Sequence, residues 1–372
     1  MSKGRIYPSE AKAWRDEKTG AQVRQVTSHP SIHHQPFYYI PAYDDAMKRL
    51  IFVSCRSGRP EIFAAVRDTG ELVQLTERAG LADWSISPSH DGAYVYFTDR
   101  EGAWRVHTET LAEEQLASFG DLEMRAAGMV GAAMGTTALS CDDCYWAVPV
   151  RAGNGSRFAV LDTRSKKWEV ILERDEIGHP EFHPDDSSLL RYAGPYRERM
   201  WVINRDGSGN RLAYRRKVAE KEWIVHETWR PGARELLVSR WPHGMIGVDI
   251  DSGSVRRITA FNAWHGMIDR SGTRMVADTN FPDIGLQLFD PCDGVGAPRL
   301  LCLSRNSNVG AHWDTDHCPY DDGPVAVYAP QHTHPHPSFS PDGTRVVFSS
   351  DHSGHAQVCE CLLEPEEGDD AP

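Results

Sequence analysis

The stretch PDGTRVVFSS at residues 341–350 decides the fold, because it is one of seven copies of a single pattern. In each copy a turn of Asp, Gly or Ser type is followed at once by a short β-rich run. Hairpin turns and alternating apolar strands repeated in this way are typical of the four-stranded blades of a β-propeller. Aligned on the second turn residue, the copies fall at Asp45, Gly92, Asp143, Asp186, Gly232, Gly272 and Gly343.

The spacing of these turns indicates the number of blades. The intervals are 47, 51, 43, 46, 40 and 71 residues, so the period is mostly in the forties. We therefore predict an all-β fold in which residues 1–372 form a single domain, a seven-bladed β-propeller. The long sixth interval is expected to hold an insertion or loop on one rim, around residues 281–329.

A second pattern predicts how the ring closes. The outer strand of several blades has the form seen in TGELVQLTE at residues 69–77, and the same signature, TGAQVRQVT, occurs at 19–27 with no blade before it. The last blade ends with its third strand at residues 356–363. We expect 19–27 to supply the missing fourth strand, which would remove the open sheet edges. Residues 364–372 are expected to be a disordered acidic tail.

The charge balance argues against two classes of partner. The 372 residues carry 40 basic and 53 acidic side chains, a formal net charge of −13, which is unfavourable for binding nucleic acid or an anionic membrane. Residues 1–20 lack an apolar core of signal-peptide length, and the most apolar stretch, 126–139, is too short and glycine-rich to span a bilayer. The 8 cysteines are spread along the chain, which suits reduced thiols better than the disulfide framework of a short secreted protein. We expect a cytoplasmic protein.

Histidines recur at one position of the repeat. His179, His265 and His336 each lie 7 residues before an aligned turn residue, and His226 lies 6 before one. The strand before each turn is expected to be the innermost strand of its blade. Repeat symmetry then places all four side chains around one end of the central channel. A single histidine there would be an ordinary rim residue, whereas four at equivalent positions indicate a shared functional site.

The segment QHTHPHP at residues 331–337 indicates metal binding. His334 and His336, two apart on an extended strand, would point to the same face, and the two prolines suit an edge strand. His265 of the neighbouring blade would add a third imidazole, and Gln331 an amide oxygen. Imidazoles suit zinc, copper, iron or nickel, and the oxygen ligand with open water positions also suits manganese. The spacing leaves the metal open, and a histidine-rich turn that binds nothing is the alternative.

Four segments together resemble the oligogalacturonate lyases, cytoplasmic seven-bladed propellers of pectin degradation. They are GHPEFHPDDS (178–187), RMWVINRDGS (199–208), VHETWRPG (225–232) and QHTHPHPSFSPDGTRVVFSSD (331–351). The resemblance covers essentially the whole chain. It implies a Brønsted base at His226, an arginine beside that base at Arg199, and manganese or another divalent transition metal bound by His265, Gln331, His334 and His336.

The resemblance implies a metal-dependent lyase that cleaves short acidic oligosaccharides, such as di- or trigalacturonate, by β-elimination. Removing the C5 proton would place a second negative charge on the neighbouring carboxylate, and a divalent ion there would stabilise it. His226, with an ordinary pKa of about 6.5, would take the proton. Arg199 would hold the carboxylate bidentately or stabilise the developing charge, and His179 would contact the substrate.

Two alternatives stay open at this point. A non-enzymatic, TolB-like propeller that binds a protein partner would account for the repeat, but not for the histidines and Arg199 around one channel mouth. A lyase of the same chemistry acting on a different short uronide would account for both. The stretches 146–158 and 302–330 would shape the substrate pocket, and in both of them the sequence departs from the family.

Overall fold

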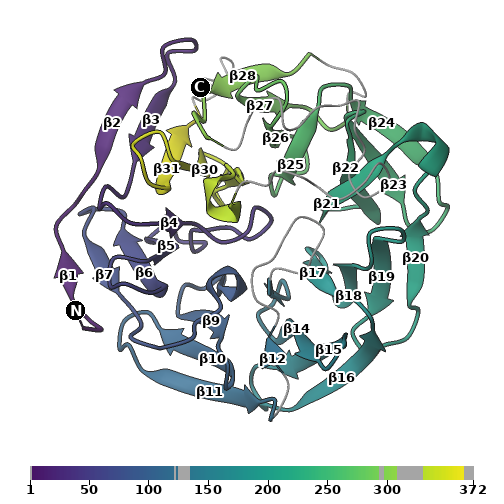
Figure 1. Cartoon of the computed structure of the whole chain (residues 1–372), viewed down its shortest axis with the longest axis horizontal. Coiled ribbons are helices and arrows are strands. Elements are labelled where there is room, and N and C mark those ends of the chain that lie inside the picture. Colours follow the sequence, from purple (N-terminus) through teal and green to yellow (C-terminus); the bar gives the residue numbers. More distant parts are fainter. Residues whose placement is uncertain (1, 121–122, 125–134, 293–296, 308–329, 364–372) are drawn as a thin grey trace, which may run out of the picture.

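The computed structural model is a seven-bladed β-propeller, as predicted (Figure 1). It describes residues 2–120, 123–124, 135–292, 297–307 and 330–363. The expected acidic tail at 364–372 and much of the expected insertion lie outside these residues. Within them, the helical elements are the short 3-10 turns η1 (Asp83–Ser85), η2 (Val218–Glu220) and η4 (Gln331–Thr333). No described helix has the length and apolarity that a membrane crossing requires.

Each blade is an antiparallel sheet whose strands are arranged side by side from the channel outward, and blades 1 and 3 each have an additional strand or strands beyond the basic four-strand order that blade 2 shows. Blade 1 contains β4 (His33–His34), β5 (Arg49–Ser54), β6 (Glu61–Val66), β7 (Leu72–Gln74) and, outermost, β1 (Ile6–Tyr7). Blade 2 contains β8 (Ser87–Pro88), β9 (Tyr94–Thr98), β10 (Gly102–His107) and β11 (Glu113–Ser118). Blade 3 contains β14 (Tyr145–Ala152), β15 (Gly155–Asp162) and β16 (Trp168–Arg174), with β12 (Glu123–Met124) and β13 (Ala138–Leu139) both paired to β14.

Blades 4 to 6, like blade 2, each consist of four consecutive strands. Blade 4 contains β17 (Gly178–His183), β18 (Asp186–Ala193), β19 (Met200–Asn204) and β20 (Arg211–Tyr214). Blade 5 contains β21 (Trp223–Trp229), β22 (Glu235–Trp241), β23 (Met245–Asp249) and β24 (Val255–Thr259). Blade 6 contains β25 (Ala263–Ile268), β26 (Met275–Thr279), β27 (Leu286–Phe289) and β28 (Arg299–Cys302).

The residue type at the aligned turn position is explained by the backbone conformation there. Gly92, Gly232, Gly272 and Gly343 have φ angles of 71°, 73°, 72° and 68°, which glycine adopts without steric cost. Asp143 occupies the same left-handed region with φ of 55°. Blades 1 and 4 differ, because Met47 is the left-handed residue in one and the other has a tight hairpin in which His183 pairs with Asp186. Five of the seven turns thus share one geometry.

The apolar core lies between neighbouring blades. Leu189 and Val202 of blade 4 pack with Leu236 and Val248 of blade 5 in one buried cluster. Successive side chains of a strand point to opposite faces of its sheet, so a regular strand directs them at its two neighbouring blades. A side chain that is to point at the channel axis therefore needs a departure from the regular strand.

Blade 7 joins the two ends of the chain. It contains β29 (Ser338–Phe339), β30 (Arg345–Ser350), β31 (Gln357–Leu362), β3 (Gln22–Gln25) and β2 (Lys12–Arg15). In the β3–β31 pair Val23 lies opposite Cys361 and Gln25 opposite Cys359. This confirms that the N-terminal segment supplies the fourth strand, and β2 adds a fifth.

Residues 35–40, which follow β4, fill the centre of the ring, and Figure 1 shows this loop reaching toward the axis. Phe37 contacts rings from four other blades, including Trp84 of blade 2 and His179 of blade 4. Phe37 and Tyr38 are fully buried. We call residues 35–40 the central plug. The repeat pattern does not predict it, although the run FYYI at 37–40 is too apolar for a surface loop.

Deleting residues 2–28 should abolish the soluble monomer, because it removes β3 and leaves β31 as an open strand edge. We expect aggregation in size-exclusion chromatography. The matched control deletes residues 2–8, which removes only β1 from the outside of blade 1 and keeps the β3–β31 pair. A monomeric, cooperatively unfolding protein after the longer deletion would contradict closure by β3.

Candidate active site

Three innermost strands carry a β-bulge at their histidine. His179 and His226 have φ angles of 46° and 55°, a region that side-chain-bearing residues seldom occupy. A bulge adds a residue to one strand and re-aims the side chains beside it. Here it turns the histidines of blades 4, 5 and 6 out of the inter-blade cores. The register shifts lie between Gly178 and Glu181, between Val225 and Thr228, and between Ala263 and Gly266.

The structure brings together three of the four predicted metal ligands. One ligand atom from each of His265, His334 and His336 lies within 4.8 Å of the other two, and all three residues are buried. The Nε2 atoms of His265 and His336 have no hydrogen-bond partner among the described residues. A buried polar nitrogen without a partner is unfavourable unless something binds it. The three imidazoles therefore fit a divalent transition metal.

The prediction that residues 331–337 form an edge strand is wrong. Gln331 starts the 3-10 turn η4, His336 has a left-handed φ of 46°, and β29 begins only at Ser338. Pro335 and Pro337 have no N–H group, so a sheet ladder has no donors there. The Gln35 amide instead donates to the carbonyls of Pro335 and His336, both at 3.0 Å. The central plug thus positions this segment.

Two further residues fix the histidine rings of blades 5 and 6. His226 Nδ1 lies 2.8 Å from the carbonyl oxygen of Trp264, so that nitrogen carries the proton. His265 Nδ1 lies 2.7 Å from Oδ2 of Asp278 on β26. The two rings are adjacent, with centroids 4.1 Å apart. No sequence motif predicted Asp278, which is the one acidic residue of the buried strand β26 (MVADT).

His226 is more strongly perturbed than the ordinary pKa assumed from sequence. Burial, together with the neighbouring His265 and the positive charge of Arg199, lowers the pKa of His226 well below its ordinary value. The imidazole is therefore neutral at neutral pH. A neutral imidazole protonated at Nδ1 has its lone pair on Nε2, where it accepts a proton or binds a metal.

Arg199 is held in place by a buried ion pair. Its Nε donates to Glu227 Oε1 at 2.9 Å, and both side chains are almost fully buried. The other oxygen of Glu227 lies 3.6 Å from Arg191, which also pairs with Glu181 and donates to the carbonyl of His179. Buried charges are tolerated when they are paired and hydrogen-bonded. The network therefore holds the Arg199 guanidinium beside His226. The sequence did not predict the supporting residues Glu227, Arg191 and Glu181.

Aromatic side chains cover the histidines. Phe37 stacks on His179 at 4.9 Å between centroids, and Tyr38 meets His226 edge-on at 5.8 Å. Trp84 lies against His336 at 5.3 Å. His179 thus belongs to the cluster, as predicted from the repeat. All the clustered histidines are buried, and rings of the central plug pack against them.

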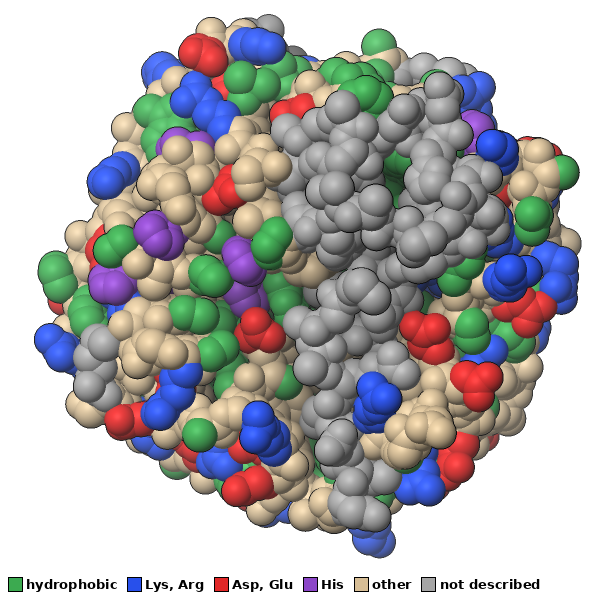
Figure 2. All heavy atoms as spheres, in the orientation of Figure 1, with side chains coloured by type: hydrophobic (Ala, Val, Ile, Leu, Met, Phe, Trp, Pro, Cys, Tyr) green, Lys and Arg blue, Asp and Glu red, His purple; other side chains and the backbone are tan. Residues whose placement is uncertain are grey.

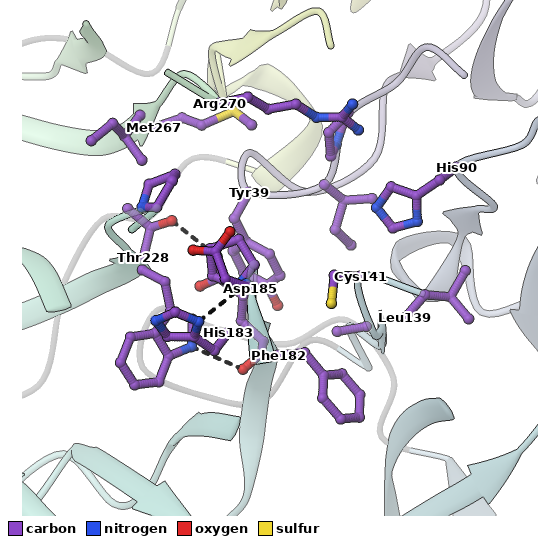
Figure 3. A pocket seen from close by; sticks show the side chains of 18 of the residues that line it. Tyr39, His90, Leu139, Cys141, Phe182, His183, Asp185, Thr228, Met267 and Arg270 are labelled. Atoms are coloured by element: carbon purple, nitrogen blue, oxygen red, sulfur yellow. Dashed lines mark hydrogen bonds between the residues drawn. The ribbon is translucent and has the colours of Figure 1, made fainter. Parts of the chain in front are cut away.

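A cavity of about 430 Å³ lies at the opposite end of the channel, among the turns after the innermost strands (Figure 3). Several of its polar side chains are already paired or hydrogen-bonded within the protein. Asp45 pairs with Arg270 at 2.5 Å, His183 Nε2 lies 3.0 Å from the carbonyl of Ala233, and Thr228 donates to Glu181. On the face in Figure 2, the described basic and acidic side chains are interspersed. These observations favour the histidine cluster as the candidate site.

Comparisons with known proteins agree on one family. A family model described as oligogalacturonate lyase matches residues 1–364. The chain is 25% identical over 393 residues to an oligogalacturonide lyase of Pectobacterium atrosepticum, covering 95% of this chain and 96% of that protein. It is 25% identical over 384 residues to an oligogalacturonate lyase of Dickeya dadantii, with the same coverages.

Two solved structures share the fold. An oligogalacturonate lyase from Vibrio parahaemolyticus matches with a TM-score of 0.80 and 22% identity, over 98% of this chain and 100% of that one. An oligogalacturonate lyase in complex with manganese matches with a TM-score of 0.80 and 24% identity, over 99% of both chains. At these identities the structural likeness shows the fold alone.

Proposed function

Because this chain belongs to the oligogalacturonate lyase family, we propose that it cleaves short oligogalacturonides by metal-dependent β-elimination. It is a lyase that acts on oligosaccharides, as its relatives are named. The observation that carries the finer proposal is the convergence of three buried imidazoles from blades 6 and 7 within 4.8 Å of one another, beside His226 and Arg199. Protein binding by a scaffold propeller does not require buried imidazoles that converge in this way.

We assign the metal site to His265, His334 and His336, and we propose Gln331, which starts the 3-10 turn η4 three residues before His334, as an additional oxygen donor. We propose manganese as the metal, because one of the similar solved structures is an oligogalacturonate lyase in complex with manganese. Other divalent transition metals suit the same ligands. When bound, such an ion would supply Lewis-acid stabilisation of negative charge on the uronate carboxylate.

His226 is proposed as the base that takes the C5 proton. Its Nδ1–H donates to the Trp264 carbonyl, which orients the ring and leaves Nε2 to accept a proton. Its lowered pKa keeps the base deprotonated at neutral pH. At 9% exposure it is the most accessible of the clustered histidines, as a group that must meet the substrate should be.

Arg199 is proposed to bind the substrate carboxylate. Glu227 occupies the Nε side of the guanidinium, and the planar group offers further N–H donors in a fixed fork. His179, which lies on β17 of blade 4 and stacks on Phe37 of the central plug, is proposed as a substrate contact. Burial and the neighbouring His265, together with the positive charge of Arg199, lower the pKa of His226, so Arg199 also helps to keep the base unprotonated.

Removing a ligand imidazole should remove the metal. After dialysis against Mn²⁺, His334→Ala and His336→Ala are expected to lose stoichiometric metal in elemental analysis, with far-ultraviolet circular dichroism unchanged. His183→Ala is the control, because this histidine is hydrogen-bonded to the Ala233 carbonyl at the other end of the channel and should keep full metal content. Full metal content in both ligand variants would rule this site out.

Replacing the base should separate catalysis from binding. His226→Ala is expected to retain metal and to bind trigalacturonate, while turnover falls about 10²- to 10⁴-fold, the usual contribution of one general base. Turnover is followed by ultraviolet absorbance of the unsaturated product. Wild-type turnover by the variant would show that another group takes the proton. A panel of short uronides run with the wild-type enzyme identifies the preferred substrate.

Arg199→Lys should lower activity although it keeps the charge. One ammonium does not reproduce the fork that would face Glu227 and a substrate carboxylate together, so kcat/KM is expected to fall roughly 10- to 100-fold. Arg105→Lys is the matched control, since Arg105 pairs with Glu114 in the outer part of blade 2. Equal activities of the two variants would count against substrate binding by Arg199.

A further inference from the structure

Asp278 holds the His265 side chain and backbone together. It lies on β26, opposite the bulge of β25, between the pairs Ala263–Thr279 and Gly266–Ala277. Its Oδ2 is 2.7 Å from His265 Nδ1, and its Oδ1 accepts the His265 backbone N–H at 2.6 Å. Both side chains are 1% exposed. One carboxylate therefore fixes the ring and the bulged backbone of the same residue.

The carboxylate also determines which ring nitrogen is free. An acceptor at Nδ1 holds the proton there, so the lone pair of the neutral imidazole lies on Nε2. That Nε2 has no hydrogen-bond partner among the described residues, and His265 forms the three-histidine group with His334 and His336. A carboxylate behind a ligating histidine also raises the basicity of the ligand nitrogen.

The fold itself does not require a carboxylate at this position. The residue opposite the bulge of β21 is Val238, and the one opposite the bulge of β17 is Tyr192, both fully buried core residues. Of these three bulged blades, only the one that contributes to the three-histidine group has an acid there. A buried carboxylate is unfavourable unless its partners compensate, so its presence in this blade calls for a local reason.

We propose that Asp278 is a positioning residue for the metal site, which orients His265 and sets its tautomer for metal binding. The inference rests on the proposed function above, because it concerns the same metal. Asp278 touches neither the metal nor the substrate in this scheme and acts only through His265. The expected consequence of its loss is weaker metal binding, with the propeller intact.

The test is the Mn²⁺ dissociation constant of Asp278→Asn, measured by calorimetry on the full chain. The amide keeps the shape but has only one acceptor oxygen for two N–H donors, so we expect affinity to fall about 10- to 100-fold. The absorption spectrum of the Co²⁺-loaded variant should change as well, because the His265 ligand is reoriented. Glu235→Gln is the control, since Glu235 is a buried carboxylate bonded to Arg256 and away from the site.

The outcomes separate this inference from the proposed function. Unchanged Mn²⁺ affinity and Co²⁺ spectrum in Asp278→Asn would overturn the role of Asp278 and leave the lyase proposal standing. If Asp278→Asn binds Mn²⁺ more weakly but the wild-type protein cleaves no short uronide, the role of Asp278 is supported and the lyase proposal is overturned. Asp278→Val serves as a second variant, because Val238 shows that this position accepts valine. If the apoproteins of both variants fail to fold, Asp278 serves the sheet, and the inference is wrong.

Discussion

The β-bulge in the innermost strands is the constraint on which the rest of the site depends. A regular strand in a propeller directs its side chains at the two neighbouring blades, where apolar packing needs them. One extra residue in β17, β21 and β25 breaks this alternation close to the axis. The bulges also redirect carbonyl groups, and that of Trp264 is placed where it holds His226. The site is thus made by small, repeated departures from an otherwise regular scaffold.

Charge around the histidines is arranged in matched pairs. Glu227 lies between Arg199 and Arg191, and Glu181 pairs with Arg191 from the other side. Two guanidiniums are thus set against two carboxylates, and burial keeps His226 neutral. In this described network the carboxylates offset the two guanidiniums, so Arg199 adds little net positive charge beside the histidines for the proposed acidic substrate. A bound divalent cation would supply what is missing, which agrees with imidazole nitrogens that have no partner among the described residues.

The sequence predicted the parts of the structure that repeat, because repetition fixes geometry without knowledge of contacts. Seven turns gave seven blades, the outer-strand signature at 19–27 gave the closing strand, and the spacing of four histidines gave their convergence. Residues 331–337 were misjudged, because alternation of histidine and proline imitates a strand while proline removes its hydrogen-bond donors. Asp278 and Glu227 were missed, since nothing local distinguishes a buried acid that pairs with a distant residue. The central plug was missed because it belongs to no repeat.

Closure by the N-terminal segment affects the order in which the chain folds. Arg24 on β3 and Glu360 on β31 are 336 residues apart, so β3 waits for a partner strand that is synthesised much later. Contacts of such separation form slowly, and the unpaired strands before closure are prone to aggregate. Gln35 and Phe37 follow this segment, and both contact His336 in the approach to blade 7. The histidine cluster is therefore completed only after the strands of blade 7 have been synthesised, and binding of the proposed metal would report on a closed ring.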